Sequence, residues 1–400
     1  MEQKIFNAIN NFYVVVMIAV TPLFIWLNWD AQEMAGLLGG YQAFAVFIKS
    51  GFSIDTFNLT FPMWGYGFLM AVSENKLFLL LFQNCFALLT LYYAINILEK
   101  ETLLPGIIIT FLKMILVGYI PWYTFHSLRW PYSIGSSLLL LSIIVLYQAV
   151  KYTDYGKLLV SGICFGLMLN FRSDYWLMPF GIAALLIVQQ RKFLASFLWL
   201  SIIVICLLPW AFYTQSVTGH YELTSTNAGH VCFIGLGNDK HNPWGIQESD
   251  GDPLMHQLVD AQFKKQHHST LNYSADQFLK QTFFEYIQNN PQAYLKKCFV
   301  AFIRMATQGT YRGEFSSQLW WLQKIASLQS KLLVFCGLLI LPITAYCAIA
   351  TGNLFFSLVA AVISYQLLLN SFCYHMPSYT TNSMVFLLLN VLYFLTILIM

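Results

Sequence analysis

The chain has 400 residues, of which 58% are apolar or aromatic and only 10% are charged, a composition too apolar for a soluble protein. Its 21 Lys and Arg against 18 Asp and Glu leave a net charge of +3, so it lacks the strongly basic character of nucleic-acid-binding proteins, and nucleic acid is not an expected partner. Residues 213–330 carry nine charges of each sign, far more densely than the rest. The charge pattern therefore predicts a membrane part and one water-exposed segment.

The apolar runs predict an all-α polytopic membrane protein. A hydrocarbon core about 30 Å thick takes a helix of about 20 apolar residues, because a helix satisfies every backbone polar group within its own segment. By this measure we expect about ten transmembrane helices. They are predicted near residues 11–28, 76–98, 103–122, 132–150, 156–171, 175–190, 193–212, 331–350, 354–372 and 382–400.

The orientation follows from the short charged turns. An N-terminus in the cytoplasm places the turns at 99–101, 151–157 and 191–192 inside, in agreement with the positive-inside rule. The outer face then receives residues 29–75, 121–131, 171–175, 213–330 and 373–381. We accordingly expect an N-terminal transmembrane module (1–212) with its first outer loop (29–75), a small, mainly helical extracytoplasmic subdomain (213–330) and C-terminal transmembrane helices (331–400).

The first outer loop begins with two acids and ends in an aromatic stretch. Asp30 and Glu33 have the spacing of a capping box, and a carboxylate at this place could equally act as a base. Apolar residues at helical spacing over 34–48 predict a helix lying along the membrane surface. The later stretch Phe61-Pro62-Met63-Trp64-Gly65-Tyr66 is typical of a packed loop at headgroup level.

The water-exposed segment opens after Pro209-Trp210 with closely spaced Gly and Asn. Asn227-Ala228-Gly229 and Gly237-Asn238 predict turns, whereas 274–303 predicts helix with a break at Asn290-Pro291. Cys232 and Cys298 are the two cysteines of this segment and could pair in an oxidising compartment. The other cysteines fall mainly in apolar runs, where buried small hydrophobes are expected.

Three cations in short outer loops are candidates for binding a phosphate. Arg172, two residues before Asp174, could clamp a phosphate in bidentate fashion or pair with that aspartate. Arg129 invites the same two interpretations, and His375 could bind phosphate or serve as a hydrogen-bonded loop histidine. The sequence contains no His spacing typical of zinc sites, no P-loop and no serine-hydrolase motif.

Taken in order, these features resemble the polytopic GT-C glycosyltransferases, in particular bacterial relatives of protein mannosyltransferases and of lipid A aminoarabinose transferases. The resemblance covers almost the whole chain. It rests on Asp30 after the first span, on the stretch containing Pro62 and Tyr66, and on Arg172-Ser173-Asp174; further matches are Pro209-Trp210, Asn227-Ala228-Gly229, Gly237-Asn238, Asn290-Pro291 and Pro377-Ser378-Tyr379. The chain departs from the family's pattern at three places. Ala31 follows Asp30 where a second acid is usual, Phe61-Pro62 has neither the second proline nor the lysine that commonly precedes the two prolines, and Ser378 stands where Arg is often found.

The resemblance implies a sugar transferred from a polyprenyl-phosphate donor to a hydroxyl of a cell-envelope lipid, glycan or protein. Asp30 would be the base with Glu33 as its helper, and the leaving phosphate would be met by Arg172, Arg129 or His375. The substrate loops would include Pro62, Tyr66, Asn227, Asn238 and Tyr379. No cofactor is required, although Asp30 with Glu33 could hold a divalent cation.

Two other functions fit parts of the pattern. An O-antigen ligase or polymerase also has many spans and a large outer loop with arginines and histidines. A transporter or flippase predicts polar, broken helices at the midplane, whereas this sequence places only Lys113 deep in a span. We expect a multi-pass protein of the bacterial inner membrane whose site faces the periplasm or exterior.

Overall fold

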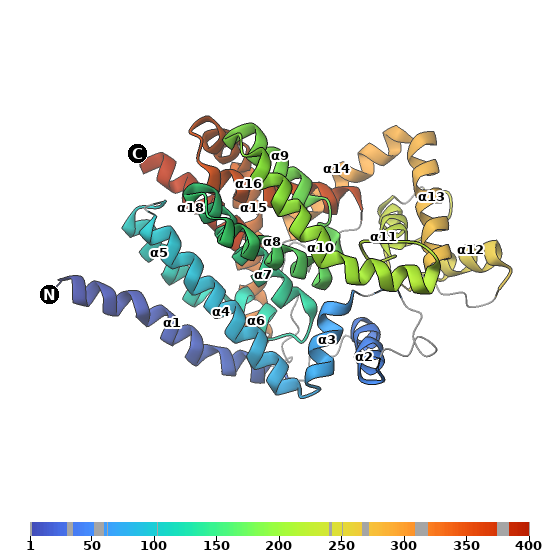
Figure 1. The fold of residues 1–400 in the computed structure, drawn as a ribbon, viewed down its shortest axis with the longest axis horizontal. Coiled ribbons are helices and arrows are strands. Elements are labelled where there is room, and N and C mark those ends of the chain that lie inside the picture. The colour runs from blue at the N-terminus through green and yellow to red at the C-terminus, as the bar shows by residue number, and fades with distance from the viewer. Residues whose placement is uncertain are drawn as a thin grey trace.

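The computed structural model describes residues 2–29, 35–51, 60–61, 63–101, 103–239, 242–249, 251–265, 272–308, 319–373 and 384–399. Within these ranges every regular element is a helix and no strand occurs, which confirms the all-α fold (Figure 1). The helices are α1 (Glu2–Leu27), α2 (Ala35–Lys49), α3 (Trp64–Val72), α4 (Lys76–Lys100), α5 (Gly106–Gly118), α6 (Ile120–His126), α7 (Pro131–Tyr152), α8 (Tyr155–Phe171), α9 (Met178–Gln190), α10 (Phe193–Thr218), α11 (Ala228–Ile234), α12 (Pro253–Phe263), α13 (Tyr273–Asn289), α14 (Pro291–Gln308), α15 (Trp320–Ala350), α16 (Leu354–Phe372) and α18 (Met384–Ile399). Short 3-10 turns, η2 (Ser173–Tyr175) and η3 (Gly235–Asn238), complete the described elements.

Fewer helices are long enough to span a membrane than the ten predicted. In the described part of the chain, α4, α7, α10, α15 and α16 are long and apolar enough, and the bent pair α5–α6 would make a sixth. This pair bends by 58°, and Pro121 near the start of α6 explains the break because it lacks a backbone N–H. The apolar part of α1, α8 and α18 are shorter apolar helices, and α9 has 13 residues. The structure thus supports a multi-pass membrane protein, without confirming ten spans.

The centre of the bundle is α7, whose side chains are buried along nearly its whole length. It packs on α8 through Ser142 and Ser161, each of whose hydroxyls donates to the other's carbonyl oxygen at 2.9 Å. On the other face of α8, a Cβ at Gly166 would lie 2.4 Å from Cys206 Cβ of α10. Small residues let these backbones approach closely, as in membrane helix pairs, where packing and interhelical hydrogen bonds replace the hydrophobic effect.

The outer helices of the bundle expose large apolar side chains. Phe197 of α10 is 67% exposed, and Leu339 and Tyr346 of α15 are 66% and 74% exposed. Such surfaces are unfavourable in water, whereas lipid chains would cover them. The one cation predicted deep in a span, Lys113, is buried and pairs with Glu99 at 3.3 Å, so its charge is compensated.

The water-exposed segment has a hydrophobic core of its own, formed by α11, α12, α13 and α14. The predicted break is confirmed, since α13 ends at Asn289 and α14 begins at Pro291. Figure 1 shows α11, α12 and α13 at the same end of the molecule as α2 and α3, away from both termini. The helix predicted for the first outer loop over 34–48 is also confirmed, as α2.

Two details of this segment differ from the predictions. The span predicted near 193–212 continues as a helix to Thr218, and Pro209 lies inside it, because a proline inside a long helix can kink it without ending it. Of the residues predicted to form turns, Asn227 lies in a turn, whereas Ala228 and Gly229 begin α11. A Cβ at Gly229 would lie 2.0 Å from the carbonyl oxygen of Asp276, so this position has no room for a side chain. A Cβ at Gly237 would lie 2.4 Å from the backbone of Gln247. Both glycines permit a close approach of neighbouring backbone.

Candidate functional site

The segment with α2 and α3, predicted as the first outer loop, packs against the C-terminal end of α8. A Cβ at Gly65 of α3 would lie 2.8 Å from the carbonyl oxygen of Asn170, so only glycine allows this approach. The next residue, Tyr66, is fully buried and meets Tyr41 of α2 edge to face, with ring centroids 5.5 Å apart. The two loop helices therefore form one wall of a site at the end of the bundle.

Arg172 directly follows α8 and faces this wall. Its Nε donates to Asp174 Oδ1 at 2.8 Å, and Nη2 makes a second bond to Oδ2. The guanidinium lies over the ring of Tyr132, 3.8 Å from the centroid, and the side chain is almost fully buried. The bidentate pair with Asp174 is therefore formed, while a contact with phosphate remains a prediction.

Arg129 lies in the turn between α6 and α7 and is also buried. Two amides of α4 fix the backbone of this turn. Gln83 Nε2 donates to the carbonyl oxygens of His126 (2.6 Å) and Leu128 (2.5 Å), and Asn84 Nδ2 donates to that of His126 (2.7 Å). Because both amides are buried in an apolar helix, they stabilise one conformation of the turn and so position Arg129.

Replacing Gln83 by Leu is expected to lower the free energy of unfolding by about 1–3 kcal/mol, because the carbonyl of Leu128 loses the partner that Gln83 provides. The measurement is unfolding in detergent. Gln189→Leu is the matched control, since Gln189 of α9 makes only a long bond, 3.5 Å, to Ala348 O. Equal losses in the two variants would contradict a special role for Gln83.

The hydroxyl of Tyr66 is a buried donor that hydrogen-bonds to no other described residue. Burial raises the pKa of this phenol, and the nearby charge of Arg129 opposes the rise. The side chain therefore stays protonated and can donate a hydrogen bond at neutral pH. A buried hydroxyl without a hydrogen-bond partner lowers stability by about 1–3 kcal/mol. A ligand that accepted this hydrogen bond would remove the cost.

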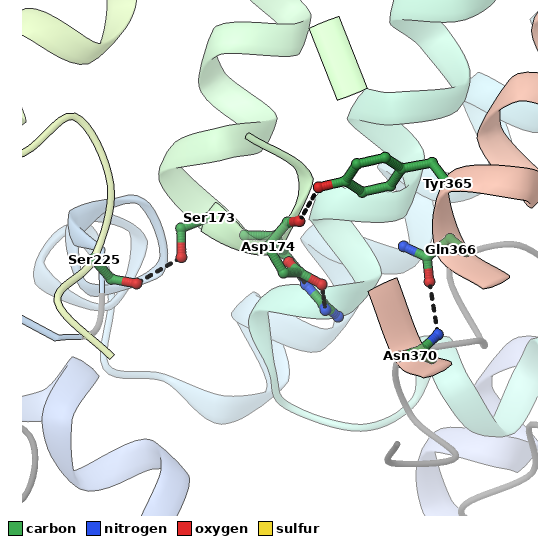
Figure 2. A network of polar contacts seen from close by, with 7 residues as sticks. Ser173, Asp174, Ser225, Tyr365, Gln366 and Asn370 are labelled. Carbon is green, nitrogen blue, oxygen red and sulfur yellow. Dashed lines mark hydrogen bonds and ion pairs between the residues drawn. The ribbon is translucent and has the colours of Figure 1, made fainter. Parts of the chain in front are cut away.

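Two further unsatisfied donors belong to neighbours in the chain of residues at this site. Among the described residues, neither Trp130 Nε1 nor Gln366 Nε2 has a hydrogen-bond partner, and both side chains are buried. Trp130 adjoins Arg129 in the chain, and Tyr365, the neighbour of Gln366, donates to the backbone oxygen of Asp174 at 2.6 Å. Figure 2 shows the Gln366 side chain below the ring of Tyr365. The site is thus rich in cations and donors, which suits an anionic or polyhydroxylated ligand.

The water-exposed segment reaches the same place through residues 225–227. Ser225 Oγ lies 2.6 Å from Ser173 Oγ and donates to Asn227 Oδ1 at 2.7 Å (Figure 2). Thr226 N donates to the carbonyl oxygen of Thr60 at 3.1 Å, two residues before Pro62. Hydrogen bonds therefore join the first outer loop, the loop that contains Arg172 and Ser173, and the water-exposed segment.

The end of α1 lies beside these loops. Phe24 stacks on Tyr123 of α6 with centroids 5.1 Å apart, and the carbonyl of Trp29 accepts a bond from Lys76 Nζ at 2.6 Å. Trp29 is the last described residue before the predicted base, Asp30, which lies outside the described residues.

The predicted site residues thus divide into three groups. Arg129, Arg172, Tyr66 and Asn227 gather at the junction of the loops. Asn238 belongs to a separate network, in which Arg304 Nη1 donates to its side-chain oxygen and, at 2.6 Å, to Glu248 Oε2. Five lie outside the described residues, namely Asp30, Glu33, Pro62, His375 and Tyr379.

The sequence interpretation missed Gln83, Asn84, Tyr132 and Gln366. The signal was present, because amides inside an apolar span are costly and usually have a role. The sequence does not show which residues these side chains contact in the folded protein.

Two cavities lie near the bundle. One of about 10 Å³ adjoins His126 and Met384 and has room for about one water molecule. A larger one, about 220 Å³, is lined by Asp154, Arg191 and Lys192 at the opposite end of α8 from Arg172. Neither lies at the junction of the loops.

No group of three or more His, Cys, Asp or Glu side chains in the described ranges could hold a metal ion. Asp30 and Glu33, the pair considered for a divalent cation, are not among those residues. Comparisons of the chain with family models, with curated proteins and with solved structures found no match.

Proposed function

We propose that the protein is an integral-membrane glycosyltransferase that moves a sugar from a polyprenyl-phosphate donor to a hydroxyl of a cell-envelope acceptor on the outer face of the membrane. The observation that carries the proposal is the pairing of two buried arginines, Arg129 and Arg172, with the buried, unsatisfied hydroxyl of Tyr66. A phosphate needs positive charge, and a sugar needs hydrogen-bond partners. This end of the bundle offers both.

The proposed reaction is a single displacement at the anomeric carbon. The acceptor oxygen forms a bond to this carbon as its bond to the phosphate oxygen breaks, and the polyprenyl phosphate leaves with the bonding electrons. Asp30 takes the proton of the acceptor hydroxyl, with Glu33 as helper. Arg129 stabilises the charge that develops on the leaving phosphate, and Arg172 keeps Asp174 and η2 in place. The configuration at the anomeric carbon is inverted.

The described carboxylate nearest to Arg172 is Asp174, and it is a poor alternative to Asp30 as the base. Both of its side-chain oxygens accept hydrogen bonds from the guanidinium. Its backbone oxygen accepts another from Tyr365. A carboxylate engaged in this way positions its neighbours instead of accepting a proton from a substrate.

The direct test is transfer by the wild-type protein in membranes supplied with a panel of donors. We expect turnover of a polyprenyl-monophosphate sugar. Turnover only of a diphosphate-linked oligosaccharide would favour a ligase or polymerase, and movement of lipid across the bilayer without transfer would favour a transporter. Either outcome would overturn the proposal.

Tyr66→Phe is expected to keep or raise the stability of the protein while lowering transfer about 10-fold to 100-fold. The variant removes only a hydroxyl that is unsatisfied before the donor binds, and a hydrogen bond to a charged group contributes about 1.5–3 kcal/mol. Transfer kinetics and unfolding in detergent measure the two effects separately.

Tyr123→Phe is the matched control, because the Tyr123 hydroxyl donates to Val117 O at 3.1 Å in the folded protein. It should lose stability, by about 1 kcal/mol, and keep its transfer rate. The same behaviour in Tyr66→Phe would show that the Tyr66 hydroxyl does not contact the donor.

A further inference from the structure

Two cysteines from distant parts of the chain meet at the outer end of α16. The sulfur of Cys232, in α11, lies 3.2 Å from that of Cys373, which directly follows α16. All eight cysteines are thiols in this structure. Because a disulfide has a sulfur–sulfur distance of about 2.05 Å, these two thiols would need to approach by little more than an ångström.

Strong contacts hold Cys373 in place. Lys297 of α14 donates to the carbonyl oxygens of Phe372 at 2.8 Å and Cys373 at 2.6 Å, and Tyr294 donates to Phe372 O at 2.7 Å. These bonds satisfy the last carbonyls of α16, and the ammonium complements the negative end of the helix dipole.

Cys232 is held equally well. The amide of His230, two residues earlier, donates to Asp276 Oδ1 at 3.0 Å, and α11 packs against α13 at Gly229. Both sulfurs therefore lie on helix ends that are fixed by hydrogen bonds and close packing.

The surroundings assign different parts to the two thiols. The hydrogen bond from Cys232, followed by the charge of Lys297, lowers the pKa of Cys373. The same hydrogen bond, together with burial, raises the pKa of Cys232. Cys373 is therefore the thiolate that reacts first with an oxidant.

We propose that Cys232 and Cys373 form a disulfide that fastens the water-exposed segment to the end of α16. The oxidant is another disulfide, which reacts by thiol–disulfide exchange. The Cys373 thiolate attacks one oxidant sulfur and releases the other as a thiolate; the deprotonated Cys232 then attacks Cys373 Sγ and releases the remaining oxidant thiolate. Two electrons pass to the oxidant, and the two thiol protons are released.

The proposal does not depend on the proposed function, and it names a different partner for Cys232 than Cys298, the partner that the sequence offered as a possibility. Cys298 lies next to Lys297 on α14 and is buried, but the sulfur of Cys232 is in contact with that of Cys373. Sequence position suggested Cys298 as the partner because Cys373 belongs to a different predicted segment. A disulfide at this place also requires an oxidising compartment, so it bears on the orientation of the chain.

The test is disulfide mapping of the full-length protein. Membranes are dissolved in SDS with N-ethylmaleimide and without reductant, and the digested protein is analysed by mass spectrometry. We expect a linked peptide pair containing Cys232 and Cys373, and two more thiols that react with a maleimide polymer after reduction than before it. Both residues found alkylated in the unreduced wild type, or a link from either to Cys298, would overturn the proposal.

Variants sharpen the result. Cys232→Ser should expose Cys373 to alkylation, and Cys373→Ser should expose Cys232. Cys298→Ser should leave the linked peptide unchanged, whereas its disappearance in that variant would contradict the assignment. The mapping of the wild type decides the question even if a variant fails to fold.

Discussion

Asp30→Asn is expected to lower the rate of sugar transfer by about 10²–10⁴-fold, the range that a positioned general base contributes. The side chains have nearly the same shape, but the amide of Asn has no basic oxygen for the proton of the acceptor hydroxyl. Asn is also about as good a helix N-cap as Asp. The substitution therefore removes the proposed chemistry and leaves a capping role intact.

The measurement is transfer from the donor that the wild type uses, at equal amounts of folded protein. Glu33→Gln serves as the companion variant and should cost less, because Glu33 is assigned only a helping role. Unchanged transfer by Asp30→Asn would identify Asp30 as a cap. A larger loss in Glu33→Gln than in Asp30→Asn would exchange the two roles.

Hydropathy predicted the all-α fold, but not the number of helices that are long enough to span a membrane. The break at Asn290-Pro291 and the helix α2 lie where their local patterns place them. Glycines were misleading where tertiary packing required them. Gly229 looks like a turn residue in the sequence, yet it lies in α11. Glycine is required there because Asp276 of α13 approaches too closely for any side chain.

The candidate site was predictable in part. Positive charge in short outer loops pointed to Arg129 and Arg172, and both are buried at the junction of the loops. The residues that position them were not predictable, because a sequence does not say which turn an amide in an apolar helix will reach. Gln83 contacts Leu128, 45 residues later, and only the packing of α4 against the turn brings them together.

Breaking the pair of Arg172 and Asp174 at one partner is expected to lower the free energy of unfolding by about 3 kcal/mol. In Asp174→Asn the guanidinium keeps its charge in a site where its side chain is only 4% exposed. The loss should lie at the lower end of the range for buried pairs, because a quarter of the Asp174 side chain is exposed. Arg172→Met should cost less, since the remaining carboxylate can be hydrated, although the contact with Tyr132 is lost.

The double variant Arg172→Met/Asp174→Asn separates structure from function. It removes both charges, so it should recover much of the stability that Asp174→Asn loses, and the double-mutant cycle gives the coupling between the two side chains. If Arg172 acts only by positioning η2, transfer should return with stability. Stability recovered without transfer would mean that the guanidinium itself meets the donor phosphate, in addition to the role assigned to Arg129. Purely additive losses of stability would contradict the ion pair as the source of the effect.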